Sequence, residues 1–101
     1  MSPLRHLWIP FFASDSIFYL RLPEAPDLFA IVSLGADLAA VWHVLEYRGG
    51  PGQDVRHSGR AVGLAGARHH AEKFMWARLT GRQKLAVTYR VKRSAAHRGR
   101  K

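Results

Sequence analysis

The segment LFAIVSLGADLAAVWHVLEY, residues 28–47, decides the fold of this chain, because it is compatible with two different structures. As one helix over residues 28–48, it would place most of its aliphatic side chains on a single stripe. As two strands, over residues 28–34 and 38–47, it would turn at the Gly-Ala-Asp tripeptide between them. β-Branched and aromatic residues, which favour pleated strands, are frequent in both runs. We therefore predict two strands.

The residues before this segment predict further strands. Residues 4–12 and 17–22 are aromatic and β-branched runs, and the turn-forming residues 13–16 separate them. This pattern predicts a β-hairpin. Two prolines then disfavour a helix over residues 23–27, because each lacks an amide donor and restricts the residue before it.

The residues after the segment predict a loop, a strand and a helix. Residues 49–54 contain three glycines and a proline, which predicts a mobile loop. Residues 55–62 follow as a short polar strand, with a bulge expected at Gly59. Residues 64–79 carry apolar side chains at a spacing of 3.6 residues, which predicts a helix on the sheet, with Gly81 just past its end.

Strict alternation of apolar and polar residues marks residues 84–93 as the clearest predicted strand, with one buried and one cationic face. Its apolar members are Leu85, Val87, Tyr89 and Val91. Residues 94–101 are small, polar and basic, and we expect a disordered tail.

These elements predict one α+β domain over residues 1–93, followed by the disordered basic C-terminal tail over residues 94–101. The domain would be an antiparallel sheet of about five or six strands with one late helix packed on it. A chain of 101 residues is of single-domain length. Eight of its eleven aromatic residues lie in the first 47, so we expect that half to fill most of the core.

The charge of the chain is divided between its two halves. Residues 1–47 carry two basic and five acidic side chains, whereas residues 48–101 carry fourteen basic and two acidic ones. The net charges are −3 and +12, which add to the +9 of the whole chain. An excess of one sign attracts a polyanion through the solvent, so we expect nucleic acid, DNA or RNA, as the partner.

Basic residues of the predicted strand over residues 84–93 are candidates for phosphate contacts. If its apolar residues are buried, Lys84, Arg90 and Lys92 share one exposed row, with neighbouring positions about 7 Å apart. The same charges would also suit an edge strand that charge protects from aggregation. The full candidate set for nucleic-acid binding is Lys84, Arg90, Lys92, Arg93, Arg98, Arg100 and Lys101, with Arg60, Arg68 and Lys73 as a second patch.

A second hypothesis belongs to another class of protein. The acidic, aromatic-rich first half suits a protein interface, as in a phage or mobile-element protein that blocks a host nuclease, polymerase or defence complex. The candidate interface residues are Trp8, Phe12, Phe18, Tyr47 and Trp76. A tryptophan beside Lys73 can also stack on an unpaired base, but we favour coverage of Trp76 by the following strand or by a partner protein.

Composition and spacing argue against several other functions. The chain has no cysteine, so no disulfide or thiolate metal site is expected, and we expect a cytoplasmic protein without membrane association. His69 and His70 are adjacent, which separates them by about 100° on a helix and disfavours a shared metal ion. The carboxylates are scattered. We therefore expect a non-catalytic accessory protein with no cofactor.

Overall fold

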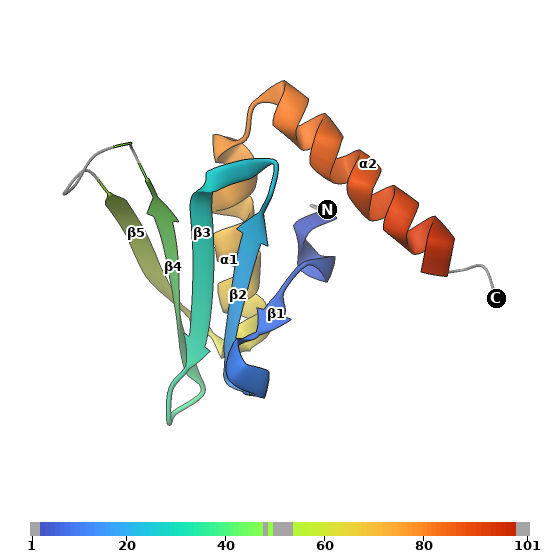
Figure 1. Ribbon diagram of the computed structural model, residues 1–101. Helices are drawn as coiled ribbons and strands as arrows, with labels where there is room; N and C mark the ends of the chain where they lie inside the picture. Colours follow the sequence, from blue (N-terminus) through green and yellow to red (C-terminus); the bar gives the residue numbers. More distant parts are fainter. Residues whose placement is uncertain (1–2, 48, 50–53, 99–101) are drawn as a thin grey trace.

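A sheet and two helices make up the structure of the chain (Figure 1). The computed structural model describes residues 3–47, 49 and 54–98. Most of the predicted mobile loop, and residues 99–101 of the predicted tail, therefore lie outside the described residues.

The two-strand prediction for residues 28–47 is confirmed. Strand β3 spans Ala25–Leu34 and strand β4 spans Ala39–Glu46, and the two strands pair antiparallel. The turn between them is closed by a 2.7 Å hydrogen bond that the Gly35 amide donates to the Ala39 carbonyl. The helix alternative for this segment is wrong.

Strand β2, Ile17–Leu22, and strand β5, Val55–Val62, extend the sheet on either side. The order is β1-β2-β3-β4-β5, and each strand is antiparallel to the next (Figure 1). The sheet has five strands, which confirms the predicted antiparallel sheet of about five or six strands and the α+β class.

The N-terminal hairpin forms with a much shorter first strand than predicted. Strand β1 is only Ile9–Pro10, and it lies between two short 3₁₀ helices, η1 at Pro3–His6 and η2 at Phe11–Ala13. A proline has no amide hydrogen for a strand ladder but is tolerated in the first turn of a helix. Pro3 starts η1 and Pro10 directly precedes η2, so the pairing with β2 is limited to two residues.

Strand β5 forms as predicted, but the expected bulge at Gly59 is wrong. The pairing of β4 with β5 runs without a register shift from Ala39 opposite Val62 to Glu46 opposite Val55. The glycine instead makes room for an aromatic ring. A Cβ atom at position 59 would lie 2.7 to 2.8 Å from ring atoms of Trp42, which stands directly opposite.

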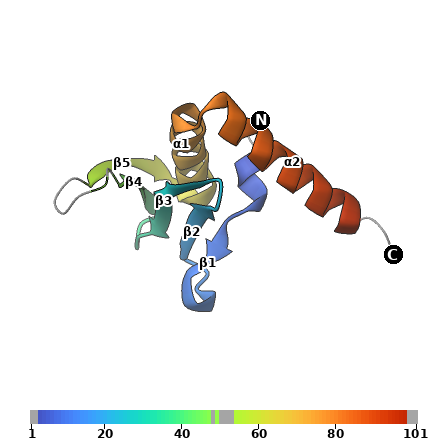
Figure 2. The same cartoon turned by 45° about the horizontal axis from the view of Figure 1, so that its top comes forward.

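Helix α1, Gly63–Arg78, confirms the helix predicted over residues 64–79 and covers one face of the sheet (Figures 1 and 2). Its buried side includes Ala67, Ala71 and Met75, each with no exposed surface. The core lies between this side and the sheet. The largest fully buried side chains of the molecule are Leu4, Leu20, Leu22, Val32, Val44, Met75 and Val87.

The strand predicted over residues 84–93 is wrong, because this segment belongs to helix α2, Gly81–Arg98. A capping box starts the helix. The Gln83 amide donates to Thr80 Oγ1 at 3.1 Å, and the Thr80 amide donates to Gln83 Oε1 at 2.8 Å. Gly81 therefore opens a second helix instead of only ending the first. The helix also continues through residues 94–98, which we expected in the tail.

The alternating apolar residues that suggested a strand form two pairs on the helix, and the members of each pair are four residues apart. Val87 is fully buried, and Val91, four residues later, packs against the core. Leu85 and Tyr89 form the other pair, and they are 74% and 68% exposed on the outer side of the helix. Side chains four residues apart share a helix face, so a period of two and a period of four produce the same short pattern.

The two helices are placed differently with respect to the sheet. Helix α2 leaves the end of α1 and packs against η1, whereas α1 lies across β3, β4 and β5 (Figure 2). The opposite face of the sheet carries side chains such as Tyr19, Phe29 and Ile31, and no described helix covers it. None of the helices in the described part of the chain has the length and apolar character needed to cross a membrane.

We expect Gly59→Ala to destabilise the protein by about 2 kcal/mol, because the new methyl group must displace the Trp42 ring, which packs against Phe74 with 5.9 Å between ring centroids. Urea denaturation of the variant and the wild type would measure the change. Gly66→Ala is the matched control, since its Cβ would meet only Ala61 Cβ, at 3.4 Å. That helical substitution should be neutral or stabilising by up to about 1 kcal/mol, and an equal loss in both variants would contradict the explanation.

Candidate nucleic-acid interface

Helix α2 carries a strong positive charge. Its 18 residues include no aspartate or glutamate. Its cationic residues are Arg82, Lys84, Arg90, Lys92, Arg93 and Arg98. The side chains of Arg82, Lys92 and Arg93 are exposed and flank the outward-facing pair Leu85 and Tyr89. This outer face of α2 presents three cations to the solvent.

Arg90 has a structural role on the inner side of the helix. It donates from Nε and Nη2 to the two carboxylate oxygens of Glu24, the second at 3.0 Å, and Glu24 lies in the turn between β2 and β3. Hydrogen bonding to Arg90 lowers the pKa of Glu24, and the same bond raises the pKa of Arg90. Gln83 adds a 3.1 Å hydrogen bond to the Glu24 carbonyl. These bonds attach α2 to the turn between β2 and β3.

The predicted exposed row of Lys84, Arg90 and Lys92 is therefore wrong. On a helix these positions point in different directions, because successive residues are rotated by about 100°. Arg90 is bound to Glu24, and Lys92 is exposed. Lys84 extends its Nζ over the ring of Trp76 in α1, 5.8 Å from the ring centroid. Lys84 thus connects α2 to a second cationic region.

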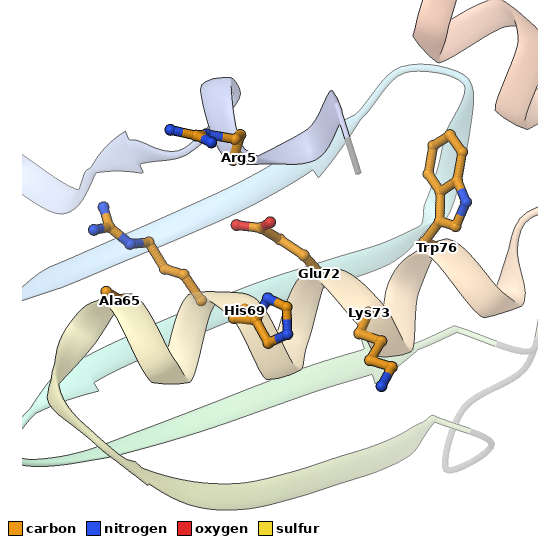
Figure 3. A pocket seen from close by; sticks show the side chains of 7 residues that line it. Arg5, Ala65, His69, Glu72, Lys73 and Trp76 are labelled. Atoms are coloured by element: carbon orange, nitrogen blue, oxygen red, sulfur yellow. The ribbon is translucent and has the colours of Figure 1, made fainter. Parts of the chain in front are cut away.

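This second region is a groove between η1 and α1 with a volume of about 630 Å³ (Figure 3). Its lining residues are Arg5, Ala65, Arg68, His69, Glu72, Lys73 and Trp76. The lining of the groove therefore contains three permanently charged cations and one carboxylate. The predicted residues Arg68, Lys73 and Trp76 come together here, and Arg5 joins them from the other end of the sequence.

The groove residues of α1 form two parallel rows. Arg68, Glu72 and Trp76 are spaced by four residues, and so are Ala65, His69 and Lys73. Figure 3 shows Glu72 and Trp76 projecting from the helix to the same side, toward the segment that carries Arg5. Arg68 lies over the ring of Phe18, with 5.3 Å from its Cζ to the ring centroid. That contact is of the cation–π type and holds the guanidinium beside the groove.

Glu72 is the one acidic group in the lining of the groove. Its side chain is 8% exposed, and its Oε2 accepts a 2.7 Å hydrogen bond from Trp8 Nε1. Trp8 thereby connects the segment after η1 to α1. Sequence analysis missed Glu72 and Arg5 as members of a site. The four-residue spacing of Arg68, Glu72 and Trp76 was the signal for Glu72, whereas nothing local points to Arg5.

The remaining predicted basic residues do not join these surfaces. Arg60 is exposed on β5, and it stands opposite Val41 on the sheet face that α1 does not cover. The second predicted patch is therefore divided between opposite faces of the sheet. Arg98 ends α2, with a side chain outside the described part, and Arg100 and Lys101 lie outside the described residues altogether.

The five residues proposed for a protein interface do not share one patch. Trp8, Phe18 and Trp76 pack against the core. Phe12 is 90% exposed in η2, and Tyr47 is 56% exposed directly after β4. Pairing of the strands places these last two at opposite ends of the sheet (Figure 1).

Glu46, at the end of β4, lies beside two basic side chains. Glu46 Oε1 lies 3.4 Å from His57 Nε2 and 4.0 Å from Arg78 Nη1. Within the described ranges, no three His, Asp or Glu side chains come together in a way that would hold a metal ion.

Comparison with known proteins assigns no family to the chain. No protein-family model matches the sequence, and no curated protein or solved structure shows significant similarity to it.

The Glu24–Arg90 pair predicts how stability depends on pH. Because the pKa of Glu24 is lowered below its ordinary value of 4.5 in the folded protein, its contribution is complete above that value and is lost as the pH falls through the folded pKa. We expect Glu24→Gln to cost about 1 kcal/mol near neutral pH, since the pair is partly exposed to solvent. The difference from wild type should shrink as the pH falls below 4.5 and vanish once Glu24 is protonated in the folded protein.

Urea denaturation of both proteins across this pH range would measure the effect. Asp37→Asn, which removes an exposed carboxylate in the turn between β3 and β4, controls for the change in net charge. A Glu24→Gln penalty that stays constant down to low pH would show that the carboxylate charge is not what holds α2 in place.

Proposed function

We propose that this protein binds nucleic acid without catalysing a reaction, and that it contacts mainly the phosphate backbone through the side of the molecule formed by its helices. The binding surface consists of the outer face of α2 and the groove between η1 and α1. One observation carries the proposal. A helix with six cationic and no acidic residues is joined, through Lys84 and Trp76, to a groove that contains Arg68 and Lys73.

The balance of charges supports a polyanion as partner. The acidic residues that pack beside the helices are largely occupied, because Glu24 binds Arg90 and Glu46 lies beside His57 and Arg78. The cations of the outer face of α2 form no ion pair within the described part of the chain. Neutralising phosphates with such side chains releases counterions, which supplies sequence-independent affinity.

The same arrangement supports a binding role over a catalytic one. Glu24, Glu46 and Glu72 are the carboxylates beside the helices, and each has an arginine, histidine or tryptophan partner. A general acid or base must be within reach of a substrate proton. Carboxylates committed to structural contacts favour a surface that holds its ligand unchanged.

A second candidate function, a protein-binding inhibitor or adaptor, has one observation in its favour. The uncovered face of the sheet carries Tyr19 stacked on Phe29, with 6.0 Å between ring centroids, and Phe12 is 90% exposed beside β1. Exposed aromatic residues are typical of protein interfaces. Under this function, a captured partner would survive nuclease treatment and would be lost on Phe12→Ser.

The proposal predicts a strong dependence of affinity on salt. With about six phosphates neutralised, the logarithm of the association constant should fall against the logarithm of salt concentration with a slope of about −5. The triple variant Arg82→Gln, Lys92→Gln, Arg93→Gln removes the cations of the outer face and should reduce that slope by about 3. Fluorescence anisotropy with labelled oligonucleotides across a salt series would measure both slopes.

A matched control changes the same net charge on the other side of the molecule. Arg21, Arg56 and Arg60 are exposed on the sheet face that α1 does not cover. Changing all three to glutamine should leave the slope within about one unit of wild type. A flat salt dependence for the wild type would contradict nucleic-acid binding, and equal effects of the two triple variants would contradict the assignment to the helical side.

A further inference from the structure

The row Arg68, Glu72 and Trp76 places three different chemical groups in order along the groove. Each is four residues from the next, which is about 6 Å along a helix axis. A cation, a carboxylate and an aromatic ring therefore follow one another along the helix at intervals of about 6 Å. A nucleotide unit also presents three groups in sequence, namely its phosphate, its sugar and its base.

The Arg68 end suits the phosphate group. No carboxylate of the described residues forms an ion pair with Arg68, and its Cζ lies 5.3 Å from the centroid of the Phe18 ring. Stacking on an aromatic ring leaves the planar edge of a guanidinium free to donate two parallel hydrogen bonds to phosphate oxygens. Arg5, on the opposite wall, adds positive charge at this level of the groove.

The Trp76 end suits the base. Its ring is partly exposed, lines the groove, and has Lys84 Nζ 5.8 Å from its centroid. Stacking of a base on an aromatic side chain contributes about 1 to 3 kcal/mol and tolerates any base. The groove volume of about 630 Å³ lies within the usual range of small-molecule sites, so one nucleotide unit fits.

Glu72, between these ends, is the informative residue. A carboxylate repels phosphate and offers only acceptors, so a ligand group that meets Glu72 favourably is one that donates a hydrogen bond. Trp8 Nε1 occupies part of its capacity at Oε2, and an ionised carboxylate can accept more bonds than this one. The 2′-hydroxyl of ribose is such a donor, and it is the group that distinguishes RNA from DNA.

We infer that the groove between η1 and α1 binds one ribonucleotide unit of a single-stranded RNA, with the phosphate on Arg68, the ribose 2′-hydroxyl on Glu72 and the base on Trp76. This inference rests on the proposed function and narrows it from nucleic acid in general to RNA. The helical side then supplies affinity through phosphate contacts, and Glu72 supplies the preference for ribose.

The test compares three fluorescein-labelled oligoadenylates of about 12 nucleotides, a length typical of single-strand sites. One is RNA, one is DNA, and one is 2′-O-methyl RNA, which keeps the oxygen but cannot donate. The wild type should bind RNA about tenfold more tightly than either of the other two. RNA and 2′-O-methyl RNA binding equally well would overturn the inference, because the donor would then be irrelevant.

Glu72→Gln provides the decisive variant. Its amide oxygen can still accept the hydrogen bond from Trp8 Nε1, so the fold is expected to persist, and thermal melting would verify this. The ratio of RNA to DNA affinity should fall from about tenfold to about threefold or less, because the charged acceptor is lost. Affinity for DNA should stay constant or rise, since a negative charge has been removed. A misfolded variant would lose both ligands.

Two controls separate the possible failures. Asp37→Asn removes the same charge in the turn between β3 and β4, and it should leave the RNA to DNA ratio unchanged. Trp76→Leu should weaken both polymers by about tenfold without changing their ratio. Equal binding of RNA and DNA by the wild type would overturn the inference and leave the proposed function standing. Binding of neither polymer would contradict the proposed function itself.

Discussion

The close contact of α1 with one face of the sheet determines where every other feature of the molecule lies. Ala67 and Ala71 of the helix face the sheet, which contributes Ala30 and Ala40, and all four have no exposed surface. Small side chains let the backbones approach closely and restrict the helix to one rotation about its axis. Once Ala67 and Ala71 are buried, the row Arg68, Glu72 and Trp76 must face η1. The groove is thus a consequence of how the core packs.

The opposite charges of the two halves of the sequence partly meet within the fold. Glu24 and Glu46 of the first half bind or approach Arg90 and Arg78 of the second half. These arginines help to hold the helices in place, and part of their charge is balanced by the carboxylates. Among the described residues, Arg68 and Lys73 of α1 and the three cations on the outer face of α2 form no ion pair, whereas Arg21, Arg56 and Arg60 lie on the uncovered face of the sheet.

Local patterns in the sequence predicted most of the sheet and the first helix, and failed where two patterns coincide. Between Leu85 and Val91, apolar residues two apart fit a strand, yet they also form two pairs four apart on a helix. The capping residues Thr80 and Gln83 could have decided between these alternatives, because they mark a helix start. The bond from Arg90 to Glu24 had no such signal, since 66 residues separate the partners. For the same reason Arg5 could not be assigned to the groove from sequence.

The placement of η1 has a consequence for the order in which the chain assembles. Each strand pairs with its neighbour in sequence, so the sheet needs only short loop closures. Leu4 is different, because it is fully buried and η1 packs against both α1 and α2. The place that Leu4 occupies is complete only when both helices are in position. We therefore expect η1 to dock after the sheet and the helices, although it precedes them in sequence, and its contacts help to hold α2 in place.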